Sequence, residues 1–594
     1  MESRSLYSSF DSDEFKRDME LLNEHTESLS RWVFGSVETN SNQEQLQWII
    51  EEYLQTHNAY KGVYICLYSY AELVSNIDGS NTVALTILDE IAERDSEIAE
   101  SVASFAKWFG NIFHSDEIIA NSAYLMKHEY YLKKLLQNTN YMQNEEIEKA
   151  VYKMQSTGSK AWQRLYMELI NHTYANIGSP DEEKKVLFSE LKNMAYDADQ
   201  AVRKAAYQAE MELCHRMSTT FAACINGISG EAITFSELRG YQNPLEKVLV
   251  KSRMDVETLN ALLEAIKENL DVFHEYFGMK ARLLGHRAGL PYYDIFAPID
   301  HENKKISFLE ARDLIISAFS SFDQELSDFA KKVFDSQWID AEPREGKAGY
   351  GMCVDIFSIH ESRIMTTFAG NYEDVIVLAH EIGHAYQSSC LGDQTMLNTD
   401  YPVPIAETAS IFCEIIMNNN LVELLPAEDS IHVAEKRIAD SAYYIVEMYA
   451  RYLFEIRLYE RRKHGALSVE QLNELMMEAL KEAYGDNIDI ASLNPYMWGS
   501  KLGYFMSGNE FCNFPYTFGV LFSKGLYSEY LQKKEGFAAL YKGFLGISST
   551  NDIVDLSKIL NIDVHLVEFW RNALNLIKKD VELLSLYKGL ERQN

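Results

Sequence analysis

Cysteine and proline are both scarce in this chain. Its 594 residues include seven cysteines and ten prolines. The number of cysteines is odd and no C-x-x-C pair occurs, which argues against a disulfide framework and is typical of a reduced, cytoplasmic protein. With so few prolines, most of the chain is free to follow a helical pattern.

Long apolar runs are missing as well. No window approaches the ~20 uninterrupted apolar residues that a membrane span requires. The first residues lead into acidic and polar sequence without an apolar signal region. We therefore expect a cytoplasmic protein that is neither exported by that route nor embedded in a membrane.

Basic residues are outnumbered, with 55 Lys and Arg against 89 Asp and Glu, so that the formal net charge is −34. Binding to nucleic-acid phosphates or anionic membranes needs clustered Lys and Arg, so the sequence predicts neither partner. The excess acid is compatible with a self-repelling surface, and also with attraction of cationic substrates.

Apolar residues recur at three- and four-residue spacing over most of the chain, which predicts a mainly helical protein. Ser307 and Glu310 form a capping-box pattern at the start of one such segment. The predicted helices cover residues 43–56, 81–112, 117–138, 143–173, 180–216, 254–285, 307–334, 428–463, 468–484 and 563–590.

The helical pattern is interrupted between residues 338 and 370. This region contains Gly346, Gly349 and Gly351 and two alternating runs, residues 352–356 and 362–368. The runs predict a small β-sheet, and a structured loop is the alternative.

The segment after this region contains the pattern H-E-x-x-H. Asn371 is a plausible N-cap, and a helix then carries His380, Glu381 and His384. The i, i+4 spacing places both imidazoles on one face, where they can share a metal ion. Glu381 is turned about 100° away from His380, where it can take a proton from a metal-held water and later protonate the leaving amine.

Four other His-Glu pairs lack a second histidine four residues later, and these begin at His128, His274, His301 and His360. The residues before the motif are apolar, from Val375 to Ala379, which predicts a buried helix. Two buried histidines and a buried carboxylate need partners, and a metal ion supplies them. Gly383 is costly inside a helix, and a close approach of another backbone would explain it.

A catalytic zinc ion takes three protein ligands and leaves one position open. Pro402 and Pro404 break the chain and can start a helix that carries Glu407 and Glu414. The two glutamates are seven residues apart and point the same way, so one can bind the metal while the other orients a ligand histidine.

The motifs together resemble those of the oligoendopeptidase F family, within the thimet-oligopeptidase-like zinc peptidases. The resemblance runs from about residue 200 to near the C-terminus, and a weaker one covers roughly residues 115–190. It is carried by the residues of segments 363–371, 374–385, 406–414 and 511–523.

The resemblance implies a two-lobed, mainly α-helical zinc endopeptidase with a deep substrate channel and a small sheet beside the H-E-x-x-H helix. One zinc ion per chain is held by His380, His384 and Glu407, Glu414 orients a ligand, and Glu381 is the general base. Short oligopeptides are the substrates, and the oligomeric state is left open.

We expect residues 1–114 to form an N-terminal helical region, and the same resemblance implies that residues 115–195 form a helical N-terminal domain and residues 196–594 the catalytic domain. A strand would pair with substrate backbone through Ile364, Thr366 and Phe368. Tyr516 would act as a catalytic hydrogen-bond donor.

The chain departs from the family pattern where donors steady the oxyanion. Family members carry a histidine near position 503 and tyrosines near 512 and 520, where this chain has Gly503, Cys512 and Val520. Loss of one such donor typically costs 10²–10³ in rate. The alternative function is therefore a catalytically weakened, peptidase-like protein that binds zinc and peptide.

Overall fold

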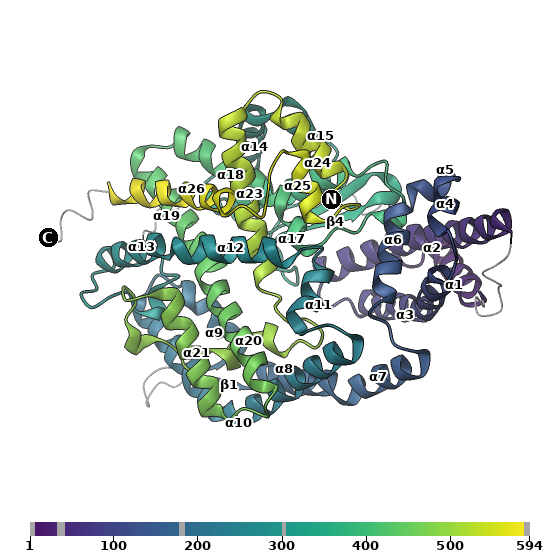
Figure 1. The fold of residues 1–594 in the computed structure, drawn as a ribbon. Helices are drawn as coiled ribbons and strands as arrows, with labels where there is room; N and C mark the ends of the chain where they lie inside the picture. Colours follow the sequence, from purple (N-terminus) through teal and green to yellow (C-terminus); the bar gives the residue numbers. More distant parts are fainter. Residues whose placement is uncertain (1–5, 33–41, 178–183, 300–304, 587–594) are drawn as a thin grey trace. The chain divides into compact units, whose positions relative to one another are not determined.

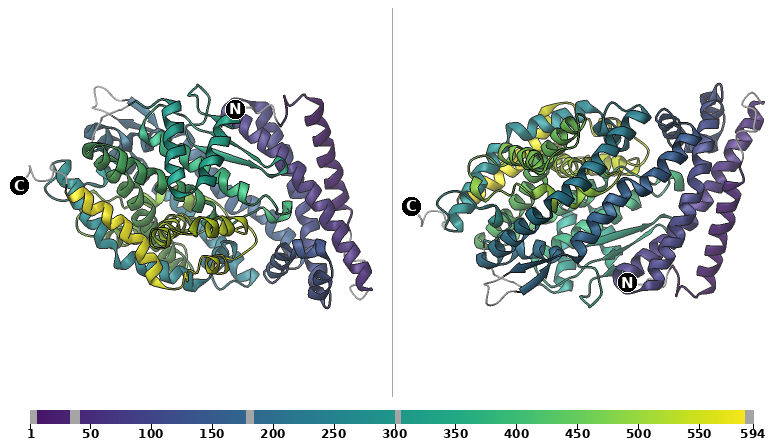
Figure 2. Two further views of the ribbon diagram at one scale, coloured as in Figure 1. Left: turned by 90° about the horizontal axis from the view of Figure 1, so that it is seen from above. Right: turned by 90° about the horizontal axis from the view of Figure 1, so that it is seen from below.

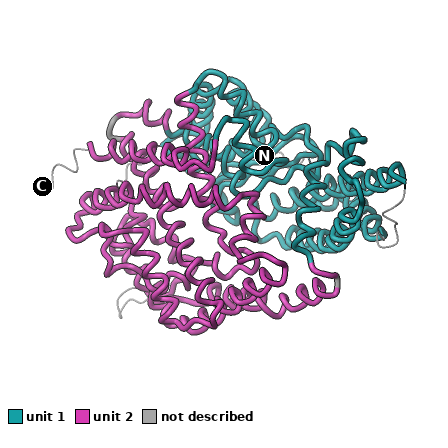
Figure 3. Tube along the Cα trace, viewed as in Figure 1, with its two compact units in different colours: residues 1–142, 303–418, 533–562 teal, residues 143–302, 419–532, 563–594 magenta. Residues whose placement is uncertain are grey.

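We describe the protein from a computed structural model, which covers residues 6–32, 42–177, 184–299 and 305–586. The fold is mainly α-helical, as predicted, with short strands (Figure 1). Two compact units divide the chain, and each is built from three separate stretches (Figure 3). No helix of the described residues is long and apolar enough to cross a membrane.

Unit 1 comprises residues 1–142, 303–418 and 533–562. Its elements are α1 (Asp13–Ser30), α2 (Gln43–Ile77), α3 (Thr82–Gly110), α4 (Ser115–Ala120), α5 (Ala123–Lys127), α6 (Glu129–Thr139), α14 (Phe308–Phe322), α15 (Gln324–Asp335), β3 (Ile339–Asp340), β4 (Met352–Ile356), β5 (Glu361–Met365), α16 (Tyr372–Cys390), α17 (Val403–Ala406), most of α18 (Thr408–Leu424), α24 (Phe537–Gly546) and α25 (Ile553–Ile559). The end of α18, from residue 419, belongs to unit 2.

Unit 2 comprises residues 143–302, 419–532 and 563–594. Its elements are α7 (Glu145–Thr157), α8 (Ser159–His172), β1 (Tyr174–Ile177), β2 (Lys184–Leu187), α9 (Phe188–Asn193), α10 (Gln200–Arg239), α11 (Pro244–Lys251), α12 (Val256–Glu268), α13 (Leu270–Leu283), α19 (Ala427–Ala442), α20 (Met448–Arg462), α21 (Val469–Tyr484), α22 (Met497–Ser500), α23 (Phe514–Lys533) and α26 (Val567–Ser585).

The compact units differ from the three consecutive domains expected from the sequence. The expected boundary at residue 114 falls inside the first stretch of unit 1, and the boundary at 195 falls inside unit 2. Segments far apart in the chain pack into one core, and such packing leaves no signal in local composition.

Some long predicted helices are divided in the structure. Residues 143–173 break at Gly158 between α7 and α8, and residues 428–463 contain a π-helix, Tyr443–Glu447, between α19 and α20. The predicted helix over 180–216 is partly wrong, because β2 occupies 184–187; its residues 180–183 lie outside the described residues. The capping box of Ser307 and Glu310 is confirmed.

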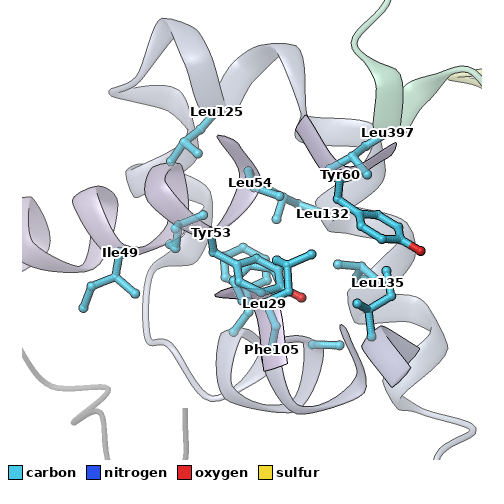
Figure 4. Packing of buried hydrophobic residues seen from close by; sticks show 14 of the residues in the cluster. Leu29, Ile49, Tyr53, Leu54, Tyr60, Phe105, Leu125, Leu132, Leu135 and Leu397 are labelled. Carbon is cyan, nitrogen blue, oxygen red and sulfur yellow. The ribbon is translucent and has the colours of Figure 1, made fainter. Parts of the chain in front are cut away.

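The N-terminal helices of unit 1 have an apolar core. Helices α1, α2 and α3 lie side by side in both views of Figure 2. Tyr53 of α2 stacks on Phe105 of α3 with ring centroids 4.2 Å apart, and Leu29, Leu54 and Leu132 pack around them (Figure 4). Burial of these side chains fixes α2 within unit 1.

The predicted sheet is confirmed as three strands in the order β3-β5-β4. Strand β4 pairs antiparallel with β5, with Met352 opposite Met365 and Ile356 opposite Glu361, and β3 runs parallel to β5. Strands β4 and β5 pack against α16, the helix that carries the H-E-x-x-H pattern. The sheet therefore lies beside that helix, as expected.

Candidate metal centre

Helix α16 begins at a reciprocal cap. The side chain of Asn371 accepts from the Asp374 backbone N–H at 2.9 Å, and Asp374 Oδ2 accepts from the backbone N–H groups of Ala369, Gly370 and Asn371. These bonds satisfy donors that a helix N-terminus leaves open, and the carboxylate also favours the positive end of the helix dipole. The predicted N-cap is confirmed.

Three side chains converge on one point above α16. His380 Nε2 lies 3.0 Å from His384 Nε2 and 3.4 Å from Glu407 Oε2, and His384 Nε2 lies 3.6 Å from the same oxygen. Zinc–ligand bonds of about 2.0–2.2 Å in tetrahedral geometry separate ligand atoms by about 3.3–3.6 Å. The two histidine–glutamate separations fall in this range, and the histidine–histidine separation of 3.0 Å is somewhat shorter. The donor set fits a zinc ion, and these residues form the group in the described chain that could hold a metal.

Glu407 reaches this point from a break between two helices. Pro402 precedes α17, α17 ends at Ala406, and α18 begins at Thr408, so Glu407 caps one helix rather than standing within it. The expected start after Pro402 is confirmed, but the single helix expected across Glu407 is divided there. Ser410 Oγ donates to Glu407 Oε2 at 3.1 Å and helps to orient the carboxylate.

Gly383 allows α18 to approach α16. A Cβ at this position would lie 2.6 Å from Ser410 Cα and 2.7 Å from the Ala409 carbonyl oxygen. This contact is the close backbone approach that the sequence suggested, and it brings the segment with Glu407 and Glu414 over the histidines.

The two histidines have different partners on their second ring nitrogens. Glu414 Oε1 is hydrogen-bonded to His380 Nδ1, and His384 bonds the backbone of Ala406. Burial lowers the pKa of His380, but the hydrogen bond and charge of Glu414 outweigh it and raise the pKa to about 9. Burial and the charge of His380 lower the pKa of His384 to about 3. Glu414 thus contacts a candidate ligand and holds its ring orientation.

Glu381 is buried beside the donor group and is not one of its members. Burial raises the pKa of its carboxyl to about 7, although the charge of His380 opposes the shift. Gly351, directly before β4, packs on this carboxylate: a Cβ there would lie 2.5 Å from Glu381 Oε1. A carboxyl group whose pKa lies near neutral pH can both accept and release a proton, so next to a metal site it is suited to proton transfer.

A polar cluster on β4 lies close to Glu381 and was not anticipated from the sequence. Asp355 accepts from Ser362 Oγ at 2.9 Å and from the Tyr401 hydroxyl at 3.4 Å, and burial raises its pKa to about 6. The charge of Asp355 acts on Glu381. The glycine-rich run before β4 was the available signal, since a missing side chain often marks a close approach.

The expected substrate contacts on β5 need correction. Strand β5 is the middle strand of the sheet, and the backbone N–H groups of Ile364, Thr366 and Phe368 donate to carbonyl oxygens within the protein. Their N–H groups are not available to a substrate strand. The edge strands of this sheet are β4 and the two-residue β3, and β4 follows Gly351, which packs on Glu381.

The residues assigned to the oxyanion lie in unit 2. Tyr516 is on α23 and is partly exposed, and Val520 is buried on the same helix. Gly503 adjoins Cys512, because a Cβ on residue 503 would lie 2.9 Å from Cys512 Sγ. The positions that depart from the family pattern at 503 and 512 are thus neighbours in space.

Known proteins with similar sequences are peptidases by name. The sequence pattern of peptidase family M3 matches residues 193–576. The chain is 25% identical to the chromosomal oligoendopeptidase F of Lactococcus lactis subsp. cremoris over 54% of this chain and 51% of that protein. It is 20% identical to the oligopeptidase PepF of Bacillus subtilis, covering 84% and 75% of the two chains. The alignment with the Lactococcus protein thus spans about half of its length.

Solved structures share the fold over nearly the whole chain. A candidate peptidase from Chlamydophila abortus superposes with a TM-score of 0.83 at 20% identity, covering 98% of this chain and 97% of that one. Oligoendopeptidase-F from Enterococcus faecium gives a TM-score of 0.72 at 16% identity, with 97% and 98% covered.

Proposed function

The chain belongs to peptidase family M3, and we propose that it is a zinc-dependent endopeptidase that hydrolyses short oligopeptides. One observation carries the proposal: the convergence of His380, His384 and Glu407 donor atoms beside the buried carboxyl of Glu381. We assign one zinc ion per chain to this group.

When bound, zinc supplies a Lewis acid that makes water a nucleophile near neutral pH and polarises the peptide carbonyl. Glu381 takes the proton of the attacking water on its carboxylate and then delivers it to the leaving amine. Glu414 keeps the His380 ring oriented, so that Nε2 is the nitrogen presented to the metal.

The substrate backbone binds along β4 in this proposal. An extended peptide can add to an exposed strand edge through main-chain hydrogen bonds, and β4 is an edge strand next to Glu381. Because main-chain bonds do not read side chains, this mode suits short flexible peptides of varied sequence. Tyr516 remains the proposed donor to the oxyanion.

A second candidate is a peptidase-like protein that binds zinc and peptide but turns over slowly. It is favoured by the contact between Gly503 and Cys512, at positions where the family pattern has donors. The cytoplasmic location and the absence of a nucleic-acid or membrane partner stay predictions under either function.

The test is metal content together with turnover of a quenched peptide library. We expect one zinc per chain, loss of cleavage after chelation, and recovery when zinc is returned. Glu381→Gln should retain zinc and lose turnover, because an amide cannot accept the proton. Cleavage by metal-free protein, or normal rates in Glu381→Gln, would exclude the proposed mechanism.

A further inference from the structure

Three tyrosines form a stack along α2 in unit 1. Tyr60, Tyr64 and Tyr68 follow one another at intervals of four residues and so share a helix face. The ring centroids of Tyr60 and Tyr64 are 5.9 Å apart at an interplanar angle of 30°, and those of Tyr64 and Tyr68 are 5.7 Å apart at 13°. Tyr60 is buried, whereas Tyr64 and Tyr68 are half-buried, so the outer part of the stack can meet a ligand.

Carboxylates surround the stack. Asp95 of α3 accepts from the Tyr60 hydroxyl at 3.3 Å, and Glu72 continues the same face of α2 beyond Tyr68. The charges of Asp95, Glu72 and Asp400 all act on Tyr64. Among the residues that the structure describes, Glu72 has no ion-pair partner, and burial raises the pKa of its carboxyl. An aromatic face with several acids creates a negative local potential.

One cation of the protein already uses this surface. Lys61 Nζ lies 5.3 Å from the centroid of the Tyr64 ring and 3.9 Å from Asp400 Oδ2. The geometry is that of a cation–π contact with a nearby carboxylate. It demonstrates that an ammonium group fits between the stack and Asp400.

The stack is connected to the strand that adjoins Glu381. Tyr401, next to Asp400, donates its hydroxyl to Asp355 of β4. The two ends of the β4 region also touch α2: Cys66 Sγ lies 2.7 Å from Ser358 Oγ, and the Tyr350 hydroxyl donates to Asn76 Oδ1 at 2.7 Å. All these residues belong to unit 1, so a peptide lying on β4 passes close to α2.

We propose that Tyr64 and Tyr68, with Glu72 and Asp400, form a subsite for a cationic side chain of the peptide substrate. The inference rests on the proposed peptidase function and adds a preference for lysine or arginine near the scissile bond. Lys61 is then an intramolecular competitor of the substrate cation.

The test uses peptide pairs that differ only by lysine or norleucine, with that residue moved through each position around the cleaved bond. Norleucine keeps the apolar stem of lysine and removes its charge. We expect kcat/KM for wild type to be roughly 3- to 30-fold higher with lysine at one position, the range expected for a partly desolvated cation–π contact.

Variants at the subsite should change this ratio in opposite directions. Glu72→Gln and Tyr68→Leu should lower the lysine-to-norleucine ratio, while Lys61→Met should raise it by removing the competitor. The lysine-to-norleucine ratio is the readout rather than either rate alone, because the ratio cancels any effect of a variant that acts equally on both peptides. Glu24→Gln removes one exposed charge from α1 of the same unit and should leave the ratio unchanged.

The outcomes separate this inference from the proposed function. Cleavage of norleucine peptides with an unaltered ratio in the Glu72, Tyr68 and Lys61 variants overturns the subsite and leaves the peptidase intact. If no peptide is cleaved by zinc-loaded protein, the proposed function fails, and calorimetric binding of the two peptides decides the subsite. Equal affinities for both peptides would then overturn it.

Discussion

Gly383 of α16 and Ser410 of α18 lie in direct backbone contact: a Cβ on residue 383 would be 2.6 Å from Ser410 Cα. An internal glycine destabilises a helix by about 1 kcal/mol relative to alanine. Here the absence of a side chain lets α18 cross α16 closely enough for Glu407 and Glu414 to reach the two histidines.

Gly383→Ala should therefore destabilise the protein, although alanine favours helices. We expect a loss of about 1–3 kcal/mol in unfolding free energy from overpacking, together with weaker zinc binding. Gly543→Ala in α24 is the matched control, since nothing lies within 4 Å of its added Cβ. It should be neutral or stabilising by up to about 1 kcal/mol. If denaturant titration gave the same unfolding free energy for both variants, the close contact between Gly383 and Ser410 would be contradicted.

Glu407→Ala and Glu414→Ala should affect zinc affinity unequally. Glu407 offers a donor atom to the metal, so its loss removes a direct bond, whereas Glu414 acts through His380 and should cost about 10- to 100-fold. Competition titration with a zinc chelator measures both. The reverse order would mean that the two glutamates have exchanged roles.

Gly351→Ala tests the packing of β4 on the general base. The added methyl group would lie 2.5 Å from Glu381 Oε1, so the carboxylate must move. A displacement of about 1 Å can cost about 10²-fold, and we expect a loss of this order in kcat with zinc content unchanged. Gly349→Ala has open space around its Cβ and should behave as wild type. Similar kcat values for the two variants would show that Glu381 tolerates the methyl group.

Tyr516→Phe tests the proposed oxyanion donor. If Tyr516 donates in the transition state, kcat should fall by about 10²–10³ while KM and zinc content stay constant. Tyr174→Phe, at an exposed tyrosine of β1, is the control. The weakened-peptidase alternative predicts the opposite: Tyr516→Phe changes nothing, and Gly503→His, Cys512→Tyr and Val520→Tyr together raise kcat.

Acid stability should depend on Glu447 in unit 2. This buried carboxylate bonds Arg451 at 2.7 Å and Lys501 at 3.0 Å. Burial raises its pKa, but the charges of Lys501 and Arg451 outweigh burial and hold the pKa at about 2. The pKa of Glu447 in the folded protein lies below the ordinary glutamate value of about 4.3, which applies to the unfolded chain. The ion pairs therefore stabilise the folded state fully when the pH is above about 4.3. This stabilisation is lost as the pH falls toward 2.

Glu447→Gln should lose roughly 3–5 kcal/mol at pH 7, since the two cations remain without their anion. The difference in unfolding free energy between this variant and wild type should become smaller as the pH falls from about 4.5 to 2, because wild type then loses the same ion pairs. Denaturant unfolding across this range measures the difference. A constant gap would mean that Glu447 does not titrate as described.

The sequence was sufficient where the deciding interactions are local. The spacing of His380 and His384 fixes their common face through the helix period alone, and Asn371 and Asp374 specify their own cap within one turn. The alternation over residues 352–356 likewise predicted β4 with its bounds. These features depend on neighbours in the chain, which the sequence displays directly.

Only tertiary packing determined the features that depend on segments far apart in the chain, such as the order of the strands and the contacts of the two glutamates. Periodicity cannot tell which neighbours flank a strand, so the sequence alone did not place β5 between β3 and β4 or put β4 at an edge. Glu407 and Glu414 were equivalent by spacing, and tertiary contacts distinguish them. Glu407 Oε2 lies near Nε2 of both histidines, whereas Glu414 contacts Nδ1 of His380. The grouping of Tyr64, Glu72 and Asp400 joins residues more than 300 positions apart. Such proximity results from burial of a shared core, which depends on the whole of unit 1 rather than on any local pattern.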